Sequence, residues 1–278
     1  MTKEILSSIY DYTLDELKER LKPSFRAKQV YNWLYKKYAN SYDDMKNLPK
    51  ELIEDLKTNY PIDILRVVKK EQSRDGSIKY LFKLRDNHTI EAVLLLMKDK
   101  KIDEDGQIVR SEKYTVCISS QVGCKVGCSF CLTARGGFVR NLTVGEYIAQ
   151  IVHIKRDNEI AENKALNIVY MGMGEPLDNF DNFVKAVEIF SELDGLAISR
   201  RRQTVSTSGI ASKIKKLGEK DLQIQLAISL HAVDDELRSE LIPMNKAYNI
   251  ASIIEAVKEF PVDTRKKVMF EYLVIKDK

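Results

Sequence analysis

Cysteines are the residues whose type and spacing in this sequence most directly indicate chemistry. All four lie within residues 117–131, and the rest of the chain has none. A disulfide framework would scatter its cysteines, whereas a metal site gathers them. Cys124, Cys128 and Cys131 form a C-x3-C-x2-C pattern on a glycine-containing segment. Three such thiolates can each hold one iron of a 4Fe-4S cubane cluster, which leaves the fourth iron without a protein ligand.

Two other interpretations of the same cysteines stay open: a structural zinc with a histidine as fourth ligand, or no metal at all. Zinc sites usually pair their ligands across a longer gap, and the nearest histidine, His153, falls inside an expected helix. The spacing therefore favours the cluster.

Polar residues follow several of the expected strands. The turn GMGEP at 172–176 offers flexible backbone and Glu175, which could accept a hydrogen bond from a substrate ammonium; STSG and SLHA end two later strands. Each is ordinary turn chemistry when taken alone. Because the carboxyl ends of parallel strands meet at one edge of a sheet, these segments and the cysteine loop are expected to form one cofactor pocket.

The cysteine spacing followed by GMGEP resembles the radical SAM superfamily. The resemblance implies that the amine and carboxylate of S-adenosylmethionine bind the open iron. One electron then cleaves the sulfonium to give a 5′-deoxyadenosyl radical.

A narrower resemblance comes from CISSQVGCKVGCSFCLTARGGFVRNLT, MGMGEPLDN, VSTSG and AISLHA. Together these segments are similar to the RlmN-type dual-specificity RNA methyltransferases, which methylate carbon 2 of adenine. The resemblance implies that Cys124, Cys128 and Cys131 bind the cluster. It also implies that S-adenosylmethionine contacts a set of residues at the strand ends: Gly174, Glu175, Ser206, Ser229, Leu230 and His231.

Two further roles rest on the resemblance alone. Cys117 matches a cysteine that forms a transient disulfide, and Glu91 matches the family's proton acceptor; by residue type alone, one is a small buried hydrophobe and the other a strand residue facing water. Carbon 2 lies between two ring nitrogens and is no nucleophile, so the family uses a radical route through a methylated cysteine near the C-terminus. No cysteine follows Cys131 here, so we expect a chain that lacks its C-terminal part and cannot complete methyl transfer.

The elements that must position these residues divide the chain in three. Residues 1–62 carry helical spacing and caps such as Thr13, and residues 63–110 alternate like antiparallel strands, with DG in RDGS as a hairpin signal. From 111 to 278 strands alternate with helices that begin near Thr143, Asn182, Ile210 and Ile250. The predicted fold class is α/β: a small N-terminal helical, RNA-binding domain, an antiparallel strand linker, and a partial (β/α) radical SAM barrel of five β/α units.

Composition is compatible with these expectations. The net charge of +4 allows a polyanionic partner without requiring one, and no apolar run reaches a membrane span. Arg135 and Arg140 flank the cysteine loop, and arginines occupy 200–202. By resemblance the partners are 23S rRNA, tRNA and a reductant such as flavodoxin; a cytoplasmic monomer is the default. The alternatives are a sister family, Cfr, that methylates carbon 8, and a non-catalytic, metal-containing RNA-binding remnant.

Overall fold

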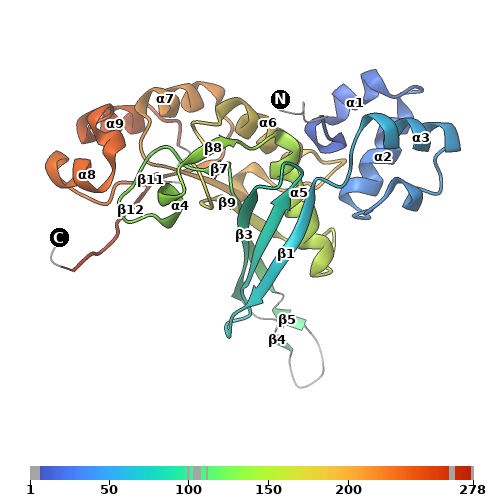
Figure 1. Cartoon of the computed structure of the whole chain (residues 1–278), viewed down its shortest axis with the longest axis horizontal. Helices are drawn as coiled ribbons and strands as arrows, with labels where there is room; N and C mark the ends of the chain where they lie inside the picture. Colours follow the sequence, from blue (N-terminus) through green and yellow to red (C-terminus); the bar gives the residue numbers. More distant parts are fainter. Residues whose placement is uncertain (1–6, 99–100, 103–107, 111, 263–266, 277–278) are drawn as a thin grey trace.

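A mixed β-sheet with helices along one face forms the centre of the computed structural model, and a helical segment lies at one end (Figure 1). The structure describes residues 7–98, 101–102, 108–110, 112–262 and 267–276. The polar segment DEDGQ at 103–107, whose composition predicts a turn, lies outside these residues. None of the described helices is long and apolar enough to cross a membrane.

The N-terminal segment is helical, as predicted. Its elements are η1 (Ile9–Asp11), α1 (Leu14–Arg20), α2 (Phe25–Tyr35), η2 (Tyr42–Asp44) and α3 (Lys50–Asn59). The Thr13 hydroxyl accepts the backbone N–H of Glu16 and caps α1, as expected. Pro49 precedes α3 as its N-cap residue.

Eight strands form one sheet in the order β1-β2-β3-β6-β9-β10-β11-β12. They are β1 (Leu65–Gln72), β2 (Ile78–Leu84), β3 (Thr89–Lys98), β6 (Lys113–Cys117), β9 (Leu166–Tyr170), β10 (Gln203–Thr207), β11 (Gln225–Ser229) and β12 (Met269–Glu271). The first three are antiparallel, and β6 to β12 are parallel to one another. β3 pairs antiparallel with β6, so the expected linker strands extend the barrel sheet. A short hairpin, β4 (Lys101–Ile102) and β5 (Ile108–Arg110), follows β3 and projects from the main sheet (Figure 1).

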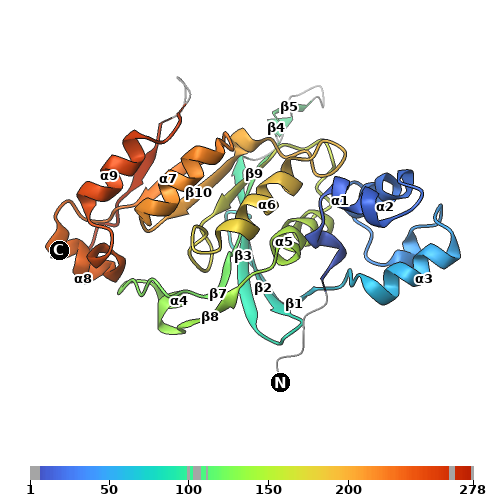
Figure 2. The same cartoon turned by 90° about the horizontal axis from the view of Figure 1, so that it is seen from above.

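Helices follow the parallel strands, as the β/α alternation predicted. They are α5 (Val144–Asp157), α6 (Phe180–Ser191), α7 (Ala211–Lys220), α8 (Asp235–Leu241) and α9 (Ile250–Lys258), with η3 (Arg200–Arg202) and η4 (Pro243–Lys246) between them. Thr143 caps α5 and Ile210 precedes α7, whereas α6 begins at Phe180, two residues before the predicted start. Figure 2 shows α5, α6, α7 and α9 following one another along the sheet.

The two faces of the sheet differ in what they contact. Residues such as Phe82, Leu94 and Val116 point to the helical face and are buried in a single apolar core that also includes the N-terminal helices. Because neighbouring side chains alternate, the pairing of Val93 with Cys117 and of Cys117 with Val169 places these three on the opposite face. That opposite face carries the candidate site.

The N-terminal helices are attached to the barrel through α5. Asp11 Oδ1 accepts the backbone N–H of Gly145 at 2.6 Å, in the first turn of α5, and Asp11 Oδ2 accepts that of Ser8. A carboxylate at a helix N-terminus satisfies an otherwise unpaired N–H group and favours the helix dipole.

Candidate active site

The cysteine loop emerges from a short hairpin beside the main sheet. Strands β7 (Gln121–Gly123) and β8 (Phe138–Asn141) pair antiparallel, and the loop between them carries α4 (Leu132–Arg135). Gly123 has a φ of +76°, and a Cβ on it would lie 1.9 Å from the carbonyl oxygen of Gly137. Only glycine fits where the two sides of the loop approach so closely. The Cys124 N–H donates to the same oxygen at 2.9 Å, which closes the base of the loop.

A cavity of about 250 Å³ lies between this loop and the carboxyl ends of the parallel strands. It brings together residues that the sequence placed on separate segments: Cys124, Cys128 and Cys131 from the loop, Gly174 and Glu175 from the glycine turn, and Ser206, Ser229 and His231 from the next two strand ends. The structure thus gathers eight of the predicted residues around one space.

The thiols in this cavity are half-buried. Burial raises the pKa of Cys124 to about 11, and burial with the neighbouring Cys124 and Cys131 thiolates raises that of Cys128 to about 12. Among the described residues, no three His, Cys, Asp or Glu side chains lie close enough together to hold one metal ion. In a cubane cluster each thiolate binds a different iron. Three thiols spread around one cavity therefore fit that group, which would also favour their ionised form.

Glu175 lines the cavity and is buried. Its Oε2 accepts the Ser208 N–H at 2.7 Å and the Ser208 hydroxyl at 2.8 Å, while Oε1 accepts the Leu177 N–H at 3.1 Å. Burial raises its pKa, and the bonds from Ser208 oppose the rise. Oε1 can accept a second hydrogen bond. The preceding Gly174 has a φ of +100°, and a Cβ there would meet Gln121 at 2.5 Å, so the turn needs glycine.

Ser206 and Ser229 meet at a third residue that was not predicted from the sequence, Glu271. Their hydroxyl oxygens are 3.2 Å apart, and each donates to Oε2 of Glu271, at 2.8 and 2.9 Å. Glu271 also lines the cavity. The rule that found the serines, a polar residue at the carboxyl end of each parallel strand, would have found Glu271 in KKVMFEYLV as well.

His231 adopts a left-handed backbone conformation, with a φ of 59°, immediately after β11. Its Nδ1 accepts the Leu273 N–H at 3.1 Å, which leaves the proton of the neutral ring on Nε2. Burial lowers its pKa. The ring meets Phe130 edge to face at 5.0 Å, so Phe130 closes one side of the cavity. The Leu230 side chain instead packs against the main core.

Cys117 and Glu91 lie on the same sheet face as the serines but do not line this cavity. Glu91 is two residues from Val93, the strand partner of Cys117. Burial raises the pKa of Cys117 to about 11, while the N–H of cavity residue Met171 lowers it. The Ser119 hydroxyl donates to the Glu91 carbonyl at 2.6 Å and accepts the Met173 N–H at 2.9 Å. The main chain of Glu91 is thus joined to the glycine turn through the Ser119 hydroxyl.

Arg238 was also not predicted from the sequence. It lies on α8 directly beneath the ends of β10 and β11 and is completely buried. The segment DELRSEL has the polar pattern of a solvent-exposed helix, so its composition gave no signal of burial.

Comparison with known proteins identifies the chain. The sequence model of the radical SAM superfamily matches residues 118–276, and that of the ribosomal RNA large subunit methyltransferase N-terminal domain matches residues 9–62. The dual-specificity RNA methyltransferase RlmN of Aliarcobacter butzleri is 93% identical over 278 residues, all of this chain and 77% of that protein. The chain belongs to the RlmN family of the radical SAM superfamily.

Other RlmN proteins and a solved structure agree. The RlmN of Sulfurimonas denitrificans is 64% identical over 98% of this chain and 76% of its own length. A crystal structure of a radical SAM methyltransferase from Sphaerobacter thermophilus has 42% identity and a TM-score of 0.87, covering 98% of this chain and 77% of that one. Both the α/β fold class and the family resemblance predicted from sequence are confirmed. Membership in the RlmN family implies a 4Fe-4S cluster and S-adenosylmethionine as cofactors.

Proposed function

We propose that this chain carries the cluster and S-adenosylmethionine site of a radical SAM RNA methyltransferase that methylates carbon 2 of an adenine in 23S rRNA and of the adenine beside the anticodon in tRNA. The observation that carries the proposal is the single cavity onto which the three cluster-type thiols, the glycine turn and the serine pair converge. Its relatives are named as dual-specificity RNA methyltransferases.

In this proposal Cys124, Cys128 and Cys131 hold the cluster, which when bound supplies the electron that cleaves S-adenosylmethionine. The main chain at Gly174 and Oε1 of Glu175 receive the methionine ammonium. Two observations support this role: Glu175 lines the cavity, and its Oε1 accepts the Leu177 N–H, which leaves a lone pair for a second hydrogen bond.

The nucleoside end of S-adenosylmethionine belongs at the strand ends of β10 and β11. Ser206 and Ser229 offer hydroxyls, and Glu271 offers a carboxylate that already accepts from both. A ribose diol donates two hydrogen bonds, which suits an acidic acceptor flanked by hydroxyls. His231 offers its Nε2–H to the adenine of S-adenosylmethionine, and Leu230 offers its main-chain groups to the same ring.

The RNA adenine approaches over the sheet face that carries Glu91 and Cys117. Glu91 accepts the ring proton from carbon 2. Cys117 forms a disulfide with the sulfur of the family's methyl-carrying cysteine as the carbon–sulfur bond to that cysteine breaks, which releases the methylated adenine. Both residues lie on the face of the sheet that also bears Ser206. A general base such as the one proposed for Glu91 typically contributes 10²- to 10⁴-fold to a reaction rate.

The remaining partners follow from the same proposal. The N-terminal helices grip folded RNA, and Arg135 near the cysteine loop contacts phosphate. Arg140 is less free for RNA, since it forms ion pairs with Asp86 and Glu146 at 2.6 and 2.7 Å. The protein acts in the cytoplasm as a monomer and receives its electrons from a flavodoxin-like reductant.

Mass spectrometry of nucleosides from rRNA and tRNA of cells with and without the gene tests the proposal. Loss of 2-methyladenosine from both pools on deletion is the expected result. Loss of 8-methyladenosine would assign the protein to the carbon-8 sister family instead. No change in either nucleoside, together with a colourless, zinc-loaded protein, would favour a non-catalytic RNA-binding remnant.

A further inference from the structure

Arg238 is a buried cation whose acceptors are all neutral. The guanidinium keeps its charge in proteins and carries five N–H donors. Its side chain on α8 is fully buried. The acceptors that the structure gives it are three main-chain oxygens and the side-chain oxygen of Asn245.

The three main-chain acceptors belong to the strand ends that line the cavity. Nη2 donates to the carbonyl of Ser208 at 2.5 Å and to that of Ser229 at 3.3 Å, and Nε donates to that of Leu230 at 3.1 Å. Ser208 in turn donates to Glu175. The planar guanidinium is a fork whose Nε and Nη2 donate to both strand ends. It therefore holds the end of β10 beside the end of β11, where S-adenosylmethionine is proposed to bind.

The far end of the same helix contacts the cysteine loop. The carbonyl of Leu241, the last residue of α8, accepts the Ser129 N–H at 2.9 Å. Leu241 and the following Ile242 form a small apolar cluster with Val126, against which Cys124 and Cys128 pack. α8 thus connects the cluster loop to the two strand ends.

The charge of Arg238 lies on the helix whose last residue contacts the cysteine loop. Burial lowers the pKa of the guanidinium, whereas the Asp235 carboxylate and the Cys128 thiolate raise it. Charges interact more strongly in a buried environment than in water, so a buried cation on this helix favours added negative charge on a cluster held by the neighbouring loop. A nearby positive charge favours reduction, because reduction adds negative charge.

We infer that Arg238 is a positioning residue with two effects: its fork holds the S-adenosylmethionine strand ends against the cysteine loop, and its charge raises the reduction potential of the cluster. The inference rests on the proposed function only in requiring a cluster and S-adenosylmethionine, and requires no RNA product.

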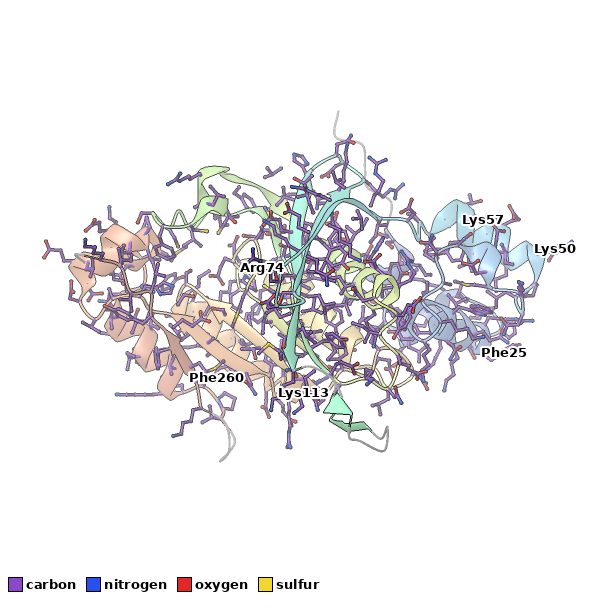
Figure 3. All side chains as sticks on the ribbon, turned by 90° about the horizontal axis from the view of Figure 1, so that it is seen from below. Phe25, Lys50, Lys57, Arg74, Lys113 and Phe260 are labelled. Carbon is purple, nitrogen blue, oxygen red and sulfur yellow. The ribbon has the colours of Figure 1, made fainter. Side chains whose placement is uncertain are left out.

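The test compares Arg238→Gln, which removes the charge, with Arg238→Lys, which keeps the charge but loses the fork. Each reconstituted chain is titrated with reductant while the reduced cluster is followed by electron paramagnetic resonance. S-adenosylmethionine affinity is measured by equilibrium dialysis. Lys57→Gln removes a charge from α3, at the opposite end of the molecule from α8, and serves as the control (Figure 3).

We expect Arg238→Gln to shift the reduction equilibrium at least tenfold toward the oxidised cluster, which is about 59 mV for one electron. Arg238→Lys is expected to stay within about threefold of the parent in that equilibrium, yet to bind S-adenosylmethionine about tenfold more weakly, a loss of about 1.4 kcal/mol. Lys57→Gln is expected to match the parent in both.

Parental potential in a folded Arg238→Gln chain overturns the inference, as does an equal shift in the Gln and Lys variants. If the Gln variant does not fold, the Lys variant decides alone: retained potential with weakened S-adenosylmethionine binding supports the inference, and any other combination overturns it. A parent chain without an iron–sulfur cluster overturns the inference together with the cluster assignment. Absence of 2-methyladenosine overturns only the proposed function.

Discussion

Lys79 forms an ion pair with Glu91, its Nζ 2.7 Å from Oε1, across the adjacent strands β2 and β3. Both side chains are nearly half exposed, and ion pairs this exposed contribute only about 0–1 kcal/mol to stability. The pair therefore matters more for holding the Glu91 carboxylate on the sheet face beside Cys117 than for the fold.

If Glu91 is the proton acceptor, Glu91→Gln introduced into the gene lowers 2-methyladenosine in cellular RNA by about 10²-fold or more. Lys79→Met has a smaller effect, because it frees the carboxylate without removing it. Glu71→Gln is the matched control, since Glu71 is another strand glutamate paired with a lysine, Lys69. Nucleoside mass spectrometry measures all three; equal losses for Glu71→Gln and Glu91→Gln would refute the role.

Changing the cysteines separates cluster ligation from other roles. Cys128→Ser is expected to abolish most bound iron and sulfide, because a cluster that loses one of three thiolate ligands is poorly held. Cys117→Ser is the control: Cys117 lies on β6 outside the cavity lining, so its iron content is expected to match the parent. Iron and sulfide analysis with visible absorption is the measurement, and iron loss in both variants would contradict the assignment.

Removing the carboxylate of Glu271 is expected to weaken S-adenosylmethionine binding. Hydrogen bonds to charged groups are worth about 1.5–3 kcal/mol, so Glu271→Gln predicts at least a tenfold higher Kd with unchanged iron content. Glu255→Gln, on the exposed side of α9, is expected to bind like the parent. Equilibrium dialysis distinguishes the two, and an unchanged Kd for Glu271→Gln would show that this carboxylate has no part in binding.

Lys155 on α5 is expected to make the free energy of unfolding depend on pH. It is 1% exposed, and burial lowers its pKa to about 8. Below pH 8 the folded state contains a buried charge. Between pH 8 and about 10.5 the unfolded chain keeps the proton that the folded chain has released, so stability rises with pH, by at most about 3 kcal/mol.

Lys155→Met is therefore expected to be more stable than the parent at pH 7, with the difference shrinking as pH rises toward 10. Denaturant unfolding at a series of pH values measures it. Exposed Lys220→Met corrects for the general loss of a lysine. A constant difference between Lys155→Met and the parent across this range would show that Lys155 does not titrate as described.

Local patterns in the sequence predicted most elements around the site. The sequence predicts a helix that starts near Thr143, and the structure shows its hydroxyl accepting the Glu146 N–H. β-branched and apolar runs predict the strands that carry Ser206 and Ser229. The cavity residues were predicted because topology alone brings the ends of parallel strands together.

What could not be predicted depends on contacts between distant segments. Arg238 resembles any surface arginine until Ser208, thirty residues earlier in the chain, is placed against it. The β7–β8 hairpin is stabilised by the close approach of Gly123 to Gly137, which no periodicity reveals. The side-chain partner of Glu91 likewise depends on strand register.

The Asp11 contact at the start of α5 begins a continuous path to the site. Further along α5, Gln150 accepts the Ser119 N–H at 2.9 Å and donates to the Ser119 carbonyl, and Ser119 in turn contacts Glu91 and the glycine turn. Amide hydrogen exchange is therefore expected to protect Gly145 and Ser119 to the same degree, both opening only with global unfolding. The N-terminal helices and the barrel would then be one foldon, and RNA bound to the helices as proposed would lie at a fixed distance and angle from the face that carries Glu91.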